Sequence, residues 1–244
     1  MTHLISYIFL VAGLLEILLP LFLGFYFHRR FGVGWRVYGV GCVLFLLSLV
    51  RTPLNTAGLR FIGRSLGGFS GTVGLLLYAA FPALTAGVFE EMARYLGFKF
   101  FVKEHRFEDG LMYGAGHGGI ESIVIAGINV LIIGVKLIFI PSSLPPGQLE
   151  IVLSLPFYLP LVGLYERIMA ITIQVGLSIT VLQSFVKSNK LYLAGAILTH
   201  FFINFVAITL MRYGIVWVEV LTTIFAIGLG TYVWRTWKQC NTNI

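Results

Sequence analysis

The chain has 244 residues, of which 58% are hydrophobic and 11% are charged, and its mean hydropathy is +0.92. Soluble domains are about 45–50% apolar and about 25% charged, so this composition excludes an ordinary water-soluble globular domain. The formal net charge is +7, but the lysines and arginines lie in short segments beside apolar runs. That pattern sets membrane topology, and we do not expect nucleic acid as a partner.

Seven apolar segments are long enough, or nearly long enough, to cross a bilayer, which takes about 20 residues. They cover residues 4–27, 35–52, 71–98, 110–140, 164–186, 191–211 and 214–234. The first is interpreted as a retained span, because Arg29 and Arg30 follow its apolar run and no A-x-A-like cleavage site comes after it. The fourth is long enough to be tilted, or broken near Gly134.

The apolar runs lack the alternation of barrel strands, so we expect an all-α polytopic bundle of seven or eight helices. One membrane domain over residues 1–244 is the simplest organisation at this length. A further apolar stretch, 149–163, contains Pro156 and Pro160. It is a re-entrant or interfacial segment, an eighth span, or part of a broken one.

Lysine and arginine counts orient the chain. With the N-terminus outside, ten of these residues lie in cytoplasmic loops and four lie outside, which puts the C-terminus in the cytoplasm. Arg51, Arg60 and Arg64, in the outside loop expected after the second span, run against this rule.

Charged and strongly polar side chains lie at membrane depth in several of the expected spans. Each charge there costs about 2.5–3.5 kcal/mol on insertion scales, so such residues usually face the bundle interior and mark function. We interpret Glu16, in the first span, as a structural or lipid-interface carboxyl because it has no partner in the set. The candidate site residues are Glu90, Glu91, Arg94, His117, Glu121, Glu166, Arg167, Gln174, His200 and Asn204.

Helical spacing organises these candidates, because residues four apart share one helix face. The pairs with that spacing are Glu90 and Arg94, His117 and Glu121, and His200 and Asn204. Glu90, His117 and His200 each lie about 10–15 Å below the expected cytoplasmic surface, and Gln174 lies nearer 20 Å. We therefore expect one carboxylate and two imidazoles in a single layer of the bundle.

A glutamate and two histidines in one layer can activate water. The glutamate removes a proton, a histidine orients the water or holds it through a metal, and a histidine with an asparagine stabilises an oxyanion. The set is also compatible with Zn²⁺ as a cofactor, for which the candidate ligands are Glu90, His117 and His200, and the sequence leaves the use of a metal open. An H-E-x-x-H motif is absent from the sequence.

Three motifs in chain order carry a resemblance to a known superfamily. They are Glu90-Glu91-Met92-Ala93-Arg94, Tyr113-x-x-x-His117 and His200-x-x-x-Asn204. Together they resemble the CAAX-protease and bacteriocin-processing (CPBP, abortive infection) superfamily of intramembrane proteases. More closely, FEEMARY, YGAGHGGIES and YERIMAITIQVGLS resemble the YhfC-type membrane peptidases of bacteria, over a core of residues 85–205.

The resemblance implies a CAAX-protease-like bundle in the bacterial plasma membrane that cleaves a membrane-embedded or membrane-proximal protein or peptide. It implies that Glu90 and His117 activate water and that His200 and Asn204 hold the scissile carbonyl or its oxyanion. The remaining candidates would support these four. A glutamate mechanism and a metal mechanism both stay open.

Two residues depart from the pattern of the resemblance. Tyr113 stands where the superfamily often has phenylalanine, and Gln174 stands where the closer family would have a third histidine. Because glutamine is a poor zinc ligand, the second departure weakens a three-histidine site and leaves open an inactive binding or immunity protein on the same scaffold. A proton-coupled transporter is a separate alternative, because buried Glu, Arg and His also form proton relays, although the sequence shows no internal repeat.

Overall fold

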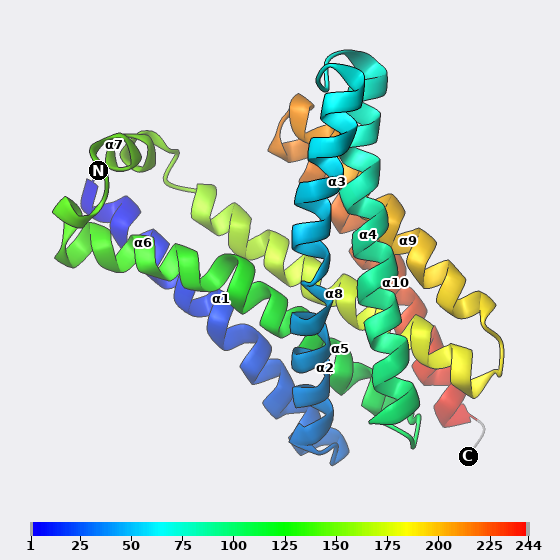
Figure 1. Cartoon of the computed structure of the whole chain (residues 1–244). Coiled ribbons are helices and arrows are strands. Elements are labelled where there is room, and N and C mark those ends of the chain that lie inside the picture. Colours follow the sequence, from blue (N-terminus) through cyan, green and yellow to red (C-terminus); the bar gives the residue numbers. More distant parts are fainter. Residues whose placement is uncertain (1, 243–244) are drawn as a thin grey trace.

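Helices account for the regular elements in residues 2–242, the part of the chain that the computed structural model describes, and no strand occurs there (Figure 1). This confirms the predicted all-α bundle. In chain order the elements are α1 (Thr2–Phe31), α2 (Trp35–Ser48), α3 (Arg51–Leu66), α4 (Gly71–Phe100), α5 (Phe107–Glu121), η1 (Ser122–Gly127), α6 (Ile128–Phe139), η2 (Pro141–Ser143), α7 (Pro146–Ser154), α8 (Leu159–Val186), α9 (Leu191–Leu210), η3 (Met211–Tyr213) and α10 (Ile215–Thr242).

Seven helical segments within the described residues are long and apolar enough to cross a membrane, so the chain is a multi-pass membrane protein. α1, α4 and α8 each make one of these segments. The others combine neighbouring elements: α2 with α3, α5 with η1 and α6, and α9 with η3; α10 is the last.

α8 runs through the middle of the bundle. In its most apolar window 67% of the residues are buried, against 17–33% in the other spans, which identifies α8 as the central helix. It packs against α1, α4, α5, α9 and α10, while α5 packs between α1, α2 and α8. α1 and α6 run side by side, and α7 lies near the start of α1 and the end of α6 (Figure 1).

The second span differs from the prediction, because residues 51–64 form a helix and not an outside loop. α2 ends at Ser48, and α3 begins at Arg51 after a two-residue break. Pro53 has no N–H to offer the carbonyl of Leu49, which instead accepts a 2.8 Å hydrogen bond from the N–H of Thr52. The chain therefore resumes as a helix after the break, and α2 and α3 together form the span Trp35–Leu66.

Two other irregular segments also differ in detail from expectation. The irregular turn of the fourth span is the π-helix η1, and α6 continues unbroken through Gly134. The stretch 149–163 consists of the end of α7, a short connection, and the start of α8, where Pro160 occupies the first turn. It is not an eighth span, because its prolines separate a nine-residue helix from α8.

α2 and α5 approach so closely that their backbones are in contact. A Cβ atom added to Gly41 would lie 2.3 Å from the carbonyl oxygen of Tyr113, and one added to Gly116 would lie 2.1 Å from the carbonyl oxygen of Tyr38. Small residues allow this approach between membrane helices. The contact also sets the position of His117, whose backbone nitrogen lies 3.0 Å from the Gly41 Cβ position.

We expect Gly41→Ala to lower the free energy of unfolding by about 1–3 kcal/mol, because the methyl group forces α2 and α5 apart. Gly39→Ala is the matched control, since a Cβ atom at Gly39 meets no atom within 4 Å. It should leave stability unchanged or raise it by about 0.4–1 kcal/mol. Thermal unfolding in detergent measures both, and equal behaviour of the two variants would contradict the close contact.

Candidate active site

Glu90 of α4 lies at the centre of a buried polar cluster. Its Oε2 atom is 3.2 Å from Nε2 of His117 on α5 and 3.9 Å from Nε2 of His200 on α9. Its Oε1 atom accepts a 2.9 Å hydrogen bond from Nη2 of Arg51, at the start of α3. The exposed fractions of Glu90, His117 and His200 are 2%, 0% and 5%, so the cluster is closed to the surroundings.

Helix boundaries explain why these three side chains meet. Glu90 lies ten residues before the end of α4, His117 ten residues after the start of α5, and His200 nine residues after the start of α9. At 1.5 Å per residue each is about 14–15 Å from its helix end. The start of α5 is fixed by Asp109, whose carboxylate accepts a 3.0 Å hydrogen bond from the backbone N–H of Arg106.

Glu91 and Arg94 form a second layer behind His200. Nδ1 of His200 lies 2.6 Å from Oε1 of Glu91, and the same oxygen accepts a hydrogen bond from Nη1 of Arg94. The Arg94 guanidinium is fully buried and also donates to Ser178 on α8. Although spacing placed Arg94 on the face of Glu90, it pairs with Glu91, and the Glu90 carboxylate takes its arginine from α3.

Gln174 joins this layer to a more distant carboxylate. Its Oε1 atom accepts a hydrogen bond from Nη2 of Arg94, and its Nε2 atom donates to Oε2 of Glu121. The amide therefore bridges a guanidinium and a carboxyl group, which suits a group with one acceptor and one donor end. Gln174 makes no side-chain hydrogen bond to Glu90, His117 or His200.

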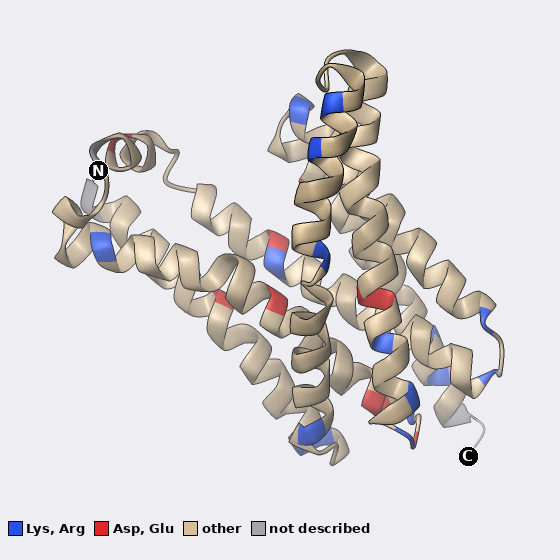
Figure 2. Cartoon of the chain, in the orientation of Figure 1, with Lys and Arg blue, Asp and Glu red and all other residues tan. Residues whose placement is uncertain are grey.

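Among the described residues, Glu166, Arg167 and Asn204 make no side-chain hydrogen bond to Glu90, His117 or His200. Arg167 donates to Glu166, and it is close enough to Glu121 and Glu16 to interact electrostatically with both. Asn204 is half-buried one turn beyond His200, and within the described residues its side chain makes no hydrogen bond. Figure 2 shows that several helices carry charged residues near the middle of the bundle.

The sequence interpretation missed three residues that touch this site. Arg51 was assigned to an outside loop, although Lys and Arg are usually in excess in cytoplasmic loops. That conflict was the available sign that Arg51 does not lie in such a loop. Phe45 of α2 places its ring edge-on to His117, with centroids 5.1 Å apart, and Ser178 accepts a 3.1 Å hydrogen bond from Nε of Arg94. Neither Phe45 nor Ser178 stands out among the apolar and small residues of its helix.

Several buried polar atoms of the site have no hydrogen-bond partner among the described residues. They are Nδ1 of His117, Oε2 of Glu91 and Nε of Arg51. Buried polar atoms are satisfied in the great majority of cases, by protein or by ordered water. These three atoms therefore mark places where water or a bound group completes the site.

The ligand types around Glu90 suit zinc, which binds imidazole nitrogen and carboxylate oxygen. The contact of Glu91 with Nδ1 of His200 is also the kind of support that orients a metal-bound histidine. However, Glu90 and His117 are in direct hydrogen-bond contact, and the described residues contain no group of three or more His, Cys, Asp or Glu arranged to hold a metal ion. The chain thus supplies side chains of the kind that bind zinc, but they are not already arranged around a metal-binding position.

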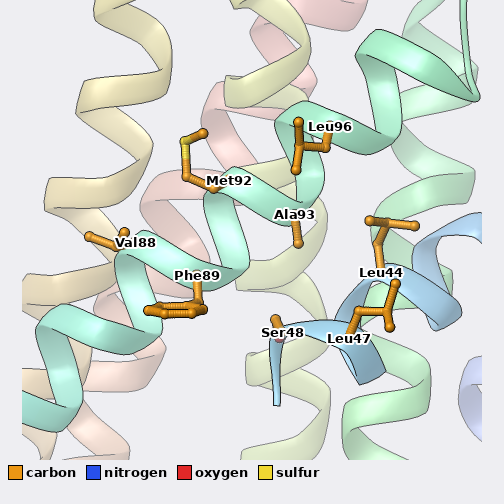
Figure 3. Close-up of a pocket in the computed structure, with 8 residues that line it drawn as sticks. All are labelled: Leu44, Leu47, Ser48, Val88, Phe89, Met92, Ala93 and Leu96. Atoms are coloured by element: carbon orange, nitrogen blue, oxygen red, sulfur yellow. The ribbon is translucent and has the colours of Figure 1, made fainter. Parts of the chain in front are cut away.

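An apolar groove lies between α2 and α4 on the outer side of the site, with a volume of about 370 Å³ (Figure 3). Ser48, at the end of α2, lies at the groove, next to the break before α3. Glu90 does not line it. The lining residues are Leu44, Leu47, Ser48, Val88, Phe89, Met92, Ala93 and Leu96.

Comparisons with known proteins agree with this architecture. Residues 15–226 match the model of a family described as YhfC intramembrane metalloprotease. A Bacillus subtilis (strain 168) protein described as "Uncharacterized membrane protein YhfC" is 33% identical over 219 residues, which cover 83% of this chain and 83% of the relative. No solved structure matches the chain significantly. The chain belongs to the YhfC intramembrane metalloprotease family.

Proposed function

We propose that this protein is an intramembrane endopeptidase that hydrolyses a peptide bond in a membrane-embedded or membrane-proximal protein segment. The observation that carries the proposal is the placement of the Glu90 carboxylate against the Nε2 atoms of His117 and His200, inside a membrane bundle. The family description, which names metalloproteases, supports the reaction class. A relation to the wider CPBP superfamily is part of this proposal and is supported by the three motifs that the chain has in common with that superfamily.

In this mechanism Glu90 is the general base. Its Oε2 atom accepts a proton from a water that His117 orients, and the resulting hydroxide attacks the scissile carbonyl carbon. The C–N bond of the tetrahedral intermediate then breaks, and Glu90 gives its proton to the leaving amine. His200, held by Glu91 at Nδ1, donates from Nε2 to the developing oxyanion as an imidazolium, the form in which both ring nitrogens carry a proton, and Asn204 is a second donor once substrate is bound. Arg94 fixes Glu91, so it acts by positioning and does not touch the reacting atoms.

Zinc, if the protein uses it, would be held by His117, His200 and Glu90. It would supply polarisation of the bound water, which lowers the barrier to forming hydroxide. Gln174 is not needed as a ligand in this arrangement, because its amide bonds Arg94 and Glu121.

The groove and the charge distribution support a protein segment reached from the membrane. The apolar lining between α2 and α4 suits an apolar chain, and lies next to the helices that carry Glu90 and the break before Arg51. Arg51, Arg60 and Arg64, the three residues that ran against the positive-inside rule, lie within the helical span Trp35–Leu66 and no longer count as an outside loop. We infer a plasma-membrane protein with its N-terminus outside, its C-terminus in the cytoplasm, and its site nearer the cytoplasmic surface.

Replacing Glu90 by Gln, or His117 by Ala, should lower the rate of peptide cleavage by about 100- to 10,000-fold, the usual contribution of a general base. Purified protein in liposomes is incubated with a library of synthetic membrane-spanning peptides, and the products are sequenced by mass spectrometry. Glu104→Gln is the control, because Glu104 is exposed and outside the spans. Equal product yields from the wild type and both site variants would refute the assignment.

Metal analysis separates the two mechanisms. If zinc takes part, purified wild-type protein should hold roughly one zinc per chain, and His117→Ala and His200→Ala should lose it, because each removes a ligand. His105→Ala should keep it, since His105 lies in the connection before α5 and contacts Phe98. Cleavage that persists in metal-free protein treated with a chelator would instead establish the glutamate mechanism.

A further inference from the structure

The site as it stands cannot admit a peptide. Glu90, His117 and His200 are each at most 5% exposed, and the apolar groove between α2 and α4 stops short of Glu90. A neighbouring element must therefore move before a substrate reaches the cluster. The element that moves should be the one whose displacement disturbs the fewest buried contacts.

α3 is that element. It contributes a charged group to the site, yet none of its residues is buried, whereas α2, α4, α5, α8 and α9 all contribute buried residues. Its main packing partner is α4, through Gly58 against Phe81 and a 2.6 Å hydrogen bond from Thr85 to Asn55. In lipid, separating two such faces replaces protein contacts by acyl-chain contacts without a hydrophobic penalty.

The break before α3 supplies a hinge. Leu49 and Val50 lie between α2 and α3, where the N–H groups of both residues turn back to carbonyls three residues earlier, at 3.2 Å. Pro53 keeps the regular helical hydrogen bond from forming across this point. Residues at the ends of elements, such as these two, commonly absorb the dihedral changes of a moving segment.

Arg51 stands one residue beyond the hinge, and its side chain is 17% exposed. Because its Nη2 atom holds Oε1 of Glu90, the other carboxylate oxygen is left to face the two imidazoles. The ion pair therefore orients the carboxylate. It also compensates the Glu90 charge, which would be costly alone in the interior.

We propose that Arg51 is a positioning residue for Glu90 and that α3 is the lateral gate that delivers it. With α3 against α4, the carboxylate is oriented and the site is closed. With α3 swung away about Leu49 and Val50, a peptide segment enters from the lipid past the groove at Ser48. This inference rests on the proposed peptidase function for its substrate, but the movement of α3 is testable without it.

Spin labels on α3 and α9 report the position of the gate. Phe61 and Leu198 are 73% and 65% exposed, so each is replaced by a labelled cysteine after Cys42 and Cys240 are changed to serine. Distances are measured by double electron–electron resonance in liposomes. We expect Arg51→Gln to add a second, longer population to the distance distribution of the labelled parent protein.

Arg51→Lys keeps the charge and should retain most of the parent distribution. Arg60→Ala, which removes an exposed charge from the same helix, should leave it unchanged. A distribution for Arg51→Gln identical to that of the parent would overturn the gate.

The positioning of Glu90 by Arg51 is then tested by measuring cleavage kinetics on a membrane peptide that the wild type cleaves. Arg51→Gln should lower kcat by about 10- to 100-fold, the scale of loss for a misplaced catalytic group, and Arg51→Lys should restore part of it. Arg60→Ala should match the wild type. A normal kcat in Arg51→Gln would overturn the positioning role.

A disulfide between Asn55→Cys and Thr85→Cys locks α3 onto α4, at a place where the native side chains already touch. We expect the oxidised form to lose cleavage and to regain it on reduction, with the reduced form as its own control. Undiminished cleavage by the oxidised form would overturn the gate. If the reduced form cleaves nothing while the spin labels still report movement, the peptidase assignment fails and the gate stands.

Discussion

Two adjacent carboxylates on one membrane helix, Glu90 and Glu91, impose the constraint on which the rest of the site depends. Each is almost fully buried, and an uncompensated charge there would cost several kcal/mol. Successive residues on a helix point about 100° apart, so the two groups face different neighbours. Glu90 therefore meets α3 and α5, and Glu91 meets α9 and the arginine of its own helix. The bundle is assembled around these two sets of contacts.

The sequence predicted the parts of this arrangement that depend on helix period and span length. His117 and His200 could be placed at the depth of Glu90 because unbroken helices rise by a constant amount per residue. The sequence did not predict which side chains contact each other across helices, or that the second span is interrupted by the break between α2 and α3. Arg51 was misplaced because the charge rule and a hydropathy window cannot distinguish a loop from a polar helix after a proline break. Arg94 pairs with Glu91 and not with Glu90 because of the directions of these side chains, which the spacing in the sequence does not determine.

Backbone contact gives the site its precision. Glycines let α5 lie against α2 at Gly41 and Gly116, and against α8 at Gly114, where a Cβ atom would lie 2.6 Å from the Cα atom of Val175. A helix held on two sides by backbone has little freedom to shift or rotate. The His117 ring consequently keeps its distance from Glu90 without a second hydrogen bond of its own, and its Nδ1 atom is left available.

Gln174 has a physical reason to be glutamine. Its position lies between the guanidinium of Arg94 and the carboxylate of Glu121, so it needs an acceptor at one end and a donor at the other. A neutral histidine offers the same two functions but only on a rigid ring, while the amide reaches both partners from a flexible stem. The departure at this position is thus consistent with a network that holds Glu91, and through it His200, in place for chemistry at Glu90.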